Sequence, residues 1–141
     1  MQYGYILAFA AAILWGLSYA INERLLTNLS PWTLMALGSL VSLVIFGPVA
    51  LWEGGAKAVT ELPSAMKKLL VLDLVVALGA STLIYWSIKY IGASRASLIE
   101  ISYPLFTALA CWIWLKQELS PKILIGGFLI LAGSWVITFS R

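Results

Sequence analysis

The sequence has no histidine and one cysteine, Cys111, which removes several kinds of site from consideration. A single cysteine forms no internal disulfide, and protein zinc and haem sites depend on cysteine and histidine ligands. We therefore expect neither a metal nor a cofactor. Charged residues are also scarce, at 11% of the chain, whereas soluble domains carry about a quarter. The net charge of +3 comes without a basic cluster, which argues against nucleic acid as a partner.

The chain is correspondingly rich in apolar residues. They make up 62% of the 141 residues, and the mean hydropathy is +0.96. So few charges would not cover a surface that faces water, so the lipid bilayer is the expected solvent. A helix needs about 20 apolar residues to cross the hydrocarbon core. Runs of that length occupy approximately residues 3–22, 31–52, 66–90, 94–114 and 121–139.

These runs lack the period-two alternation of a membrane barrel, so they are interpreted as helices. The sequence predicts an all-α membrane protein with five transmembrane helices in one domain, residues 1–141. Small residues at helical spacing favour close helix packing. In the last run such residues form a smooth side for another helix or subunit: Gly126, Gly127, Gly133 and Ser134.

Lysine and arginine are divided almost equally between the two sides on which the loops between five spans would lie. One side has five of them, at Lys57, Lys67, Lys68, Lys116 and Lys122. The other has four, at Arg24, Lys89, Arg95 and Arg141. Orientation follows the excess of these residues in short loops, so the signal is weak. Two topologies stay open: one orientation with a cytoplasmic N-terminus, and dual insertion that gives oppositely oriented copies which pair.

One acidic residue, Glu100, stands inside the fourth run. Acidic side chains are costly in hydrocarbon and usually face a bundle interior or a watery cavity. Pro104 lacks a backbone N–H, so the carbonyl of Glu100 loses its helical partner and a helix break is predicted. Such a carboxyl group suits a cationic substrate group or a transported proton. The alternative is a structural hydrogen bond to a neighbouring helix. Residues at three-to-four spacing share its face: Ser97, Pro104, Thr107 and Cys111.

Aromatic and polar residues recur along one side of the first run, at Trp15, Ser18, Tyr19 and Asn22. The third run has a similar set that includes Tyr85, and Tyr103 stands beside Pro104. Facing Glu100, these side chains would line a cavity with aromatic walls and few polar groups, a common composition for sites that bind organic molecules. The alternative is that the aromatic rings belong to the belts at the membrane interface.

The remaining acidic residues are interpreted as anchors. Asp73 lies about one turn after Lys67 and Lys68, so an ion pair near the interface is expected. Glu23 ends the first run, and Glu118 lies in the fourth loop.

Several motifs follow one another in a familiar order. They are Ala12–Gly16, Tyr90–Ser97, Tyr103–Phe106, Glu118–Pro121 and Leu129–Gly133. Together they resemble the EamA domain of the drug/metabolite transporter superfamily over essentially the whole chain. Most members contain two such five-helix halves in inverted orientation, so the resemblance implies one half of an inverted-repeat transporter. It also implies pairing, as an antiparallel homodimer or as a heterodimer with a similar chain.

The sequence departs from these relatives near its acidic residue. Many have a glutamate immediately before the proline of the fourth helix, where this chain has Tyr103. The four-helix small multidrug transporters place their essential glutamate in the first helix, where Leu14, Trp15 and Gly16 stand here. Their proton-coupled export applies here only if Glu100 has taken over that role.

The expected function is a secondary transporter that exports small organic metabolites or drugs across the cytoplasmic membrane as an antiparallel dimer. The site would consist of Glu100 with Trp15, Tyr19, Asn22, Tyr85 and Tyr103, and Pro104 would supply the helix break. Two alternatives are a subunit of a lipid-linked sugar flippase and a membrane subunit that stabilises a partner without transporting. An enzyme is not expected, because no base stands beside Cys111 or a serine.

Overall fold

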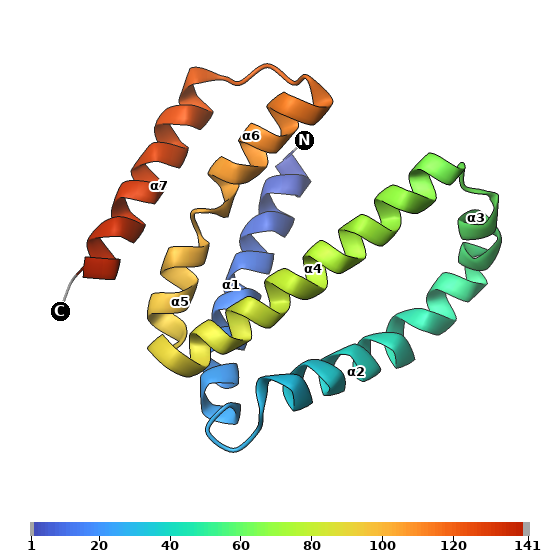
Figure 1. The fold of residues 1–141 in the computed structure, drawn as a ribbon, viewed down its shortest axis with the longest axis horizontal. Helices are drawn as coiled ribbons and strands as arrows, with labels where there is room; N and C mark the ends of the chain where they lie inside the picture. Colours follow the sequence, from blue (N-terminus) through green and yellow to red (C-terminus); the bar gives the residue numbers. More distant parts are fainter. Residues whose placement is uncertain (1, 140–141) are drawn as a thin grey trace. The chain divides into compact units, whose positions relative to one another are not determined.

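The computed structural model describes residues 2–139, which form seven α-helices and no strands. Arg141, which the loop-charge comparison includes, lies outside the described residues. The helices are α1 (Gln2–Leu25), α2 (Pro31–Trp52), α3 (Gly55–Glu61), α4 (Ser64–Ile91), α5 (Ala93–Glu100), α6 (Tyr103–Leu115) and α7 (Pro121–Phe139), as labelled in Figure 1.

Five helical segments are long and apolar enough to cross a membrane. They are α1, α2, α4, α7 and the pair α5 and α6, which together cover Ala93–Leu115. The predicted all-helical class and the number of spans are confirmed. Most large apolar side chains of these segments are exposed, an arrangement that water would penalise and that lipid accommodates.

Two features add detail to the predicted runs. The fourth run is two helices, because α5 ends at Glu100 and α6 begins at Tyr103. The loop after α2 contains the short helix α3, which begins after Gly54 and ends before Pro63. Gly54 has a φ of 78°, a left-handed conformation that glycine adopts without strain, so the chain can turn out of α2 there.

The chain divides into two compact units. The first unit comprises residues 2–23 and 87–139, and therefore most of α1 with α5, α6 and α7. The second comprises residues 24–86, and therefore α2, α3 and most of α4.

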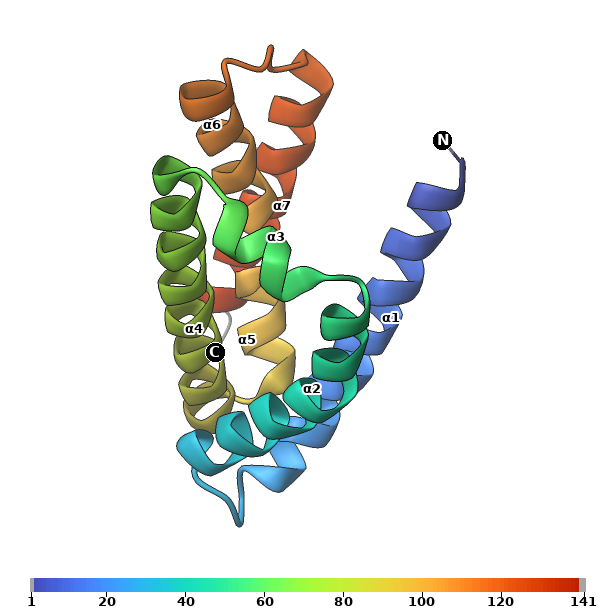
Figure 2. The same ribbon diagram turned by 90° about the vertical axis from the view of Figure 1, so that its right-hand side faces the viewer.

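In the first unit the broken helix packs along α7, which contacts both α5 and α6 (Figure 1). A Cβ on Gly127 of α7 would lie 3.0 Å from Cδ1 of Leu105, so glycine permits the close approach of α6 and α7. Ser134 of α7 donates a hydrogen bond to the carbonyl of Leu98 in α5 at 2.7 Å. Figure 2 shows α1 diverging from these helices toward its N-terminal end.

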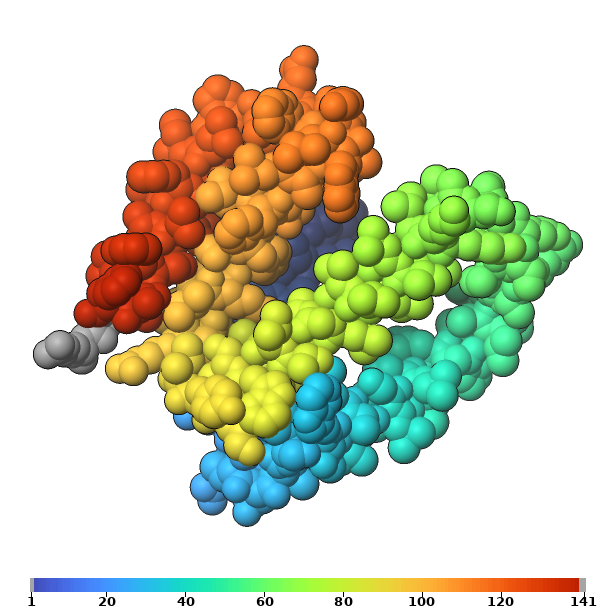
Figure 3. Space-filling view, viewed as in Figure 1, coloured from blue at the N-terminus to red at the C-terminus, as the bar shows by residue number. Residues whose placement is uncertain are grey.

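In the second unit α2 and α4 meet through side chains near one end of each helix. The rings of Trp32 and Trp86 meet edge to face, with centroids 6.5 Å apart, where α2 begins and α4 nears its end. The hydroxyl of Thr82 lies 3.6 Å from the sulfur of Met35. Away from these contacts the space-filling view in Figure 3 shows an opening between α2 and α4.

Candidate functional site

The break between α5 and α6 leaves the backbone carbonyl of Glu100 without a donor. The last carbonyls of a helix need partners from outside the helix. The carbonyl of Ser97 accepts from the N–H of Ile101, that of Leu98 accepts from Ser134, and that of Ile99 accepts from Ser102. The carbonyl of Glu100 would accept from residue 104, which is proline and has no N–H. Among the described residues no other donor reaches it.

The carboxylate of Glu100 lies at the same break and meets a side chain of α1. The hydroxyl of Tyr19 donates a hydrogen bond to Oε2 of Glu100. Both residues are half-buried and lie 81 positions apart in the sequence. The structure thus brings together two of the predicted site residues, and a charge-assisted bond of this kind is among the stronger ones in proteins.

The other predicted residues of α1 differ in their surroundings. The ring of Trp15 lies 5.8 Å from that of Tyr19, centroid to centroid, with an interplanar angle of 46°. Trp15 remains 60% exposed, so one face of this aromatic pair is open. Asn22 is buried, and its Nδ2 donates to Oγ of Ser18 at 3.4 Å. Asn22 is therefore engaged within its own helix.

A second carboxylate, that of Glu23, lies at the start of α5. Its Oε2 accepts a hydrogen bond from the N–H of Ala93 at 2.8 Å. Gly92 separates α4 from α5 and has no side chain to cap the helix that follows, so Glu23 of α1 supplies the acceptor. The negative charge also suits the positive end of the helix dipole. Tyr19 and Glu23, one turn apart on α1, thus hold the two ends of α5.

Tyr103 and Pro104 line an open groove along α6. The groove has a volume of about 380 Å³, and Thr107, Cys111 and Glu118 also contribute to it. Tyr103 is 61% exposed. Glu100 does not belong to this groove, because the chain turns at residues 101–102 between α5 and α6. The face predicted to be continuous is therefore divided between the groove and the contact with α1.

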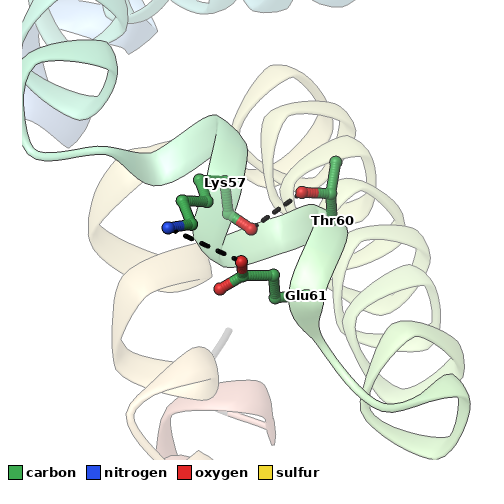
Figure 4. A network of polar contacts seen from close by, with 3 residues as sticks. All are labelled: Lys57, Thr60 and Glu61. Carbon is green, nitrogen blue, oxygen red and sulfur yellow. Dashed lines mark hydrogen bonds and ion pairs between the residues drawn. The ribbon is translucent and has the colours of Figure 1, made fainter.

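Tyr85 belongs to the second unit, on α4, where it is half-buried. Asp73, on the same helix, forms no ion pair with Lys67 or Lys68, so that prediction is wrong. The ammonium group of Lys67 donates to the carbonyl of Thr60 at 2.8 Å, which provides it with another partner. An ion pair does form within α3, where Nζ of Lys57 lies 3.7 Å from Oε1 of Glu61 (Figure 4). Both side chains are exposed, so this pair adds little stability.

The sequence interpretation missed two participants in this region. The sequence pattern predicts an anchor at Glu23 and a small packing residue at Ser134. The sequence contained a signal for the role of Glu23. A helix that starts at Ala93, directly after a glycine, has no side chain at its N-cap, so its first N–H groups need an acceptor from another part of the chain. The sequence offered no comparable signal for Ser134.

The described residues contain no group of three or more histidine, cysteine, aspartate or glutamate side chains that could hold a metal ion. Together, Glu100, Tyr19 and the broken helix form a small polar site within two apolar spans.

Comparison with known proteins gives a consistent result. Residues 2–139 match the model of the EamA-like transporter family. An uncharacterized transporter of Archaeoglobus fulgidus is 24% identical over 136 residues, which are 96% of this chain and 47% of that protein. The chain therefore spans about half the length of this curated relative. No solved structure matches it significantly.

Proposed function

The chain belongs to the EamA-like transporter family, and on that premise we propose that it exports small organic metabolites or drugs across the cytoplasmic membrane. The family is one of transporters and not of enzymes, and its domain is a half-unit of drug/metabolite transporters. The chain is accordingly a multi-pass membrane protein. Its substrate, its direction of transport and the membrane in which it works are part of the proposal.

The observation that carries the proposal is the hydrogen bond between Tyr19 and Glu100 beside the helix break. A carboxylate within a span is costly unless it is paired or protonated, and such residues mark substrate or proton pathways. Broken helices at these sites expose backbone carbonyls that bind cations. In the proposed cycle Glu100 takes up either a proton or the substrate, and Tyr19 stabilises the carboxylate between these events. Trp15 and Tyr103 supply apolar walls, and Asn22 supports α1.

The proposed working form contains two five-helix units in opposite orientations. Inverted repeats around a site near the bilayer midplane are a general architecture for alternating access. The nearly equal division of lysine and arginine supports insertion in both orientations, and hence an antiparallel homodimer. A heterodimer with a similar chain of fixed opposite orientation is the alternative arrangement.

Membrane topology tests this arrangement directly. Cys111→Ala provides a background without thiols, into which Ala56→Cys and Ser94→Cys are introduced singly. Ala56 is preferable to Gly55, because a Cβ at Gly55 would lie 2.7 Å from the carbonyl oxygen of Ala50. Intact cells are then labelled with a membrane-impermeant thiol reagent. Labelling at both positions supports dual insertion, and labelling at only one position rules out the antiparallel homodimer.

Transport is tested in proteoliposomes that contain a pH-sensitive dye. A panel of metabolites and drugs is added outside, and proton movement coupled to uptake is recorded for the wild-type chain. We expect Glu100→Gln to abolish every such signal. Glu61→Gln is the matched control, because it makes the same change at an exposed acid of α3. Signals that survive in Glu100→Gln would remove Glu100 from the mechanism, and no signal with any compound would favour a non-transporting subunit.

A further inference from the structure

The Glu100 region presents hydrogen-bond acceptors to a ligand. One carboxylate oxygen, Oε2, receives the hydroxyl proton of Tyr19. The other, Oε1, has no hydrogen-bond partner among the described residues. No side-chain oxygen of the described part of the chain is both buried and unpartnered, so Oε1 is accessible. A donor from a ligand can therefore reach Oε1 while Tyr19 keeps its own bond.

The backbone adds a second acceptor at the same residue. The carbonyl of Glu100 has lost its helical donor to Pro104, and the neighbouring carbonyls of Leu98 and Ile99 already accept from serine side chains. Burying an acceptor without a partner costs free energy. A ligand with several N–H groups would satisfy both acceptors of Glu100, whereas a ligand without any hydrogen-bond donor would satisfy neither.

An aromatic surface lies next to these acceptors. Trp15 and Tyr19 lie in ring contact one turn apart on α1, and Trp15 keeps most of its surface exposed. Aromatic faces attract cations and also cover flat apolar groups. A positive charge bound at Glu100 and an apolar body against Trp15 would use both features of the site.

We propose that the substrate is a protonated organic amine with an apolar body, recognised by N–H donation to Oε1 and the backbone carbonyl of Glu100. This rests on the transport function proposed above and adds a substrate class to it. Primary and secondary ammonium groups and guanidinium groups meet the requirement. Quaternary ammonium compounds carry the same charge but no N–H, so they bind poorly. Anionic metabolites are repelled by the carboxylate.

The test compares two probes that differ in their donors. These are 2-phenylethylammonium and its N,N,N-trimethyl analogue, which share the phenyl body and the single positive charge. Binding of each to the full chain in lipid nanodiscs is measured by isothermal titration calorimetry. Because hydrogen bonds to charged groups are worth about a factor of ten or more in affinity, we expect 2-phenylethylammonium to bind at least about tenfold more tightly.

Two variants connect this preference to the proposed site. Glu100→Gln removes the charge and should reduce the preference for 2-phenylethylammonium to less than about twofold. Glu61→Gln should leave both affinities as in the wild-type chain. If the trimethyl analogue binds equally well or more tightly, or if neither probe binds at millimolar concentration, the proposed substrate class is wrong.

The outcome is separable from a failure of the transport function. Equal binding of the two probes that is lost in Glu100→Gln overturns the N–H requirement and keeps Glu100 as the binding residue. Binding of both probes that is unchanged in Glu100→Gln overturns the site itself. The proteoliposome signals, which use a broad panel of compounds, report independently whether the chain transports.

Discussion

Each of the two units has a proline inside a candidate membrane span, but only one of these spans is interrupted. In the second unit α2 continues past Pro48 without interruption from Pro31 to Trp52. In the first unit the helix stops at Glu100, and Pro104 stands in the first turn of a new helix. Both prolines lack the N–H that a continuous helix would need at their position, so the missing donor alone does not decide whether the helix breaks.

The difference lies in the groups that replace the lost hydrogen bonds. At the end of α5, Ser102 and Ser134 donate to the carbonyls of Ile99 and Leu98. No side chain of the described residues donates to a carbonyl of α2 near Pro48, and α2 nevertheless continues as one helix. A break within a span is tolerated where side chains satisfy the freed carbonyls. In the first unit these two bonds leave the carbonyl of Glu100 without a donor among the described residues.

Each unit contains a glycine with positive φ, and we expect the strongest destabilisation among the variants at one of these two positions. Gly92 of the first unit has φ 82° and ψ 160°, a region that is essentially restricted to glycine. A Cβ there would also lie 3.4 Å from Oε1 of Glu23. Gly92→Ala should therefore lower the free energy of unfolding by about 2–3 kcal/mol. Gly54→Ala in the second unit enters the ordinary left-handed region and should cost about 1 kcal/mol.

Thermal unfolding in detergent measures both glycine variants, with Gly126→Ala as a control because nothing lies within 4 Å of a Cβ there. Equal destabilisation by Gly92→Ala and Gly54→Ala would contradict the expectation that the turn between α4 and α5 requires glycine more strictly than the turn after α2.

Exchanging each proline for alanine tests whether the break serves transport. Pro104→Ala restores an N–H that can occupy the carbonyl of Glu100 and favours a continuous helix. We expect the transport rate in proteoliposomes to fall about tenfold, which corresponds to about 1.4 kcal/mol in the barrier. Pro48→Ala should leave the rate within about twofold. Transport that is equally insensitive to both substitutions would assign the break a purely structural role.

The hydrogen bond from Ser134 offers a smaller test. Ser134→Ala leaves the carbonyl of Leu98 without its side-chain donor and should cost about 1–2 kcal/mol of stability. Thr82→Val is the matched change in the second unit, where Thr82 contacts only a sulfur on α2 and a carbonyl of its own helix. That variant should cost less than about 0.5 kcal/mol. Denaturation of both proteins in mixed micelles gives the difference, and a larger loss for Thr82→Val would reverse the comparison.

We expect the carboxylate of Glu23 at the start of α5 to contribute least to the free energy of unfolding. Glu23→Gln keeps an oxygen acceptor for the N–H of Ala93 and removes the negative charge. The loss should be about 0.5 kcal/mol, the value of one charge at an exposed helix terminus. Glu23→Ala also removes the acceptor and should cost about 1 kcal/mol. Chemical denaturation at two salt concentrations separates these terms, because only the charge contribution falls with salt. Identical stability of all three proteins would show that the cap contributes nothing.

The sequence determined the class of the protein, the five spans, the acidic residue within one of them and the lost donor at Pro104. These follow from apolar length and from the chemistry of a single residue, which act locally along the chain. The tertiary structure decided that Tyr19 meets Glu100, that Glu23 caps α5 and that Ser134 satisfies Leu98. Those partners lie 81, 70 and 36 positions apart. Contacts over such separations depend on how whole helices pack, and no local pattern of residues specifies them.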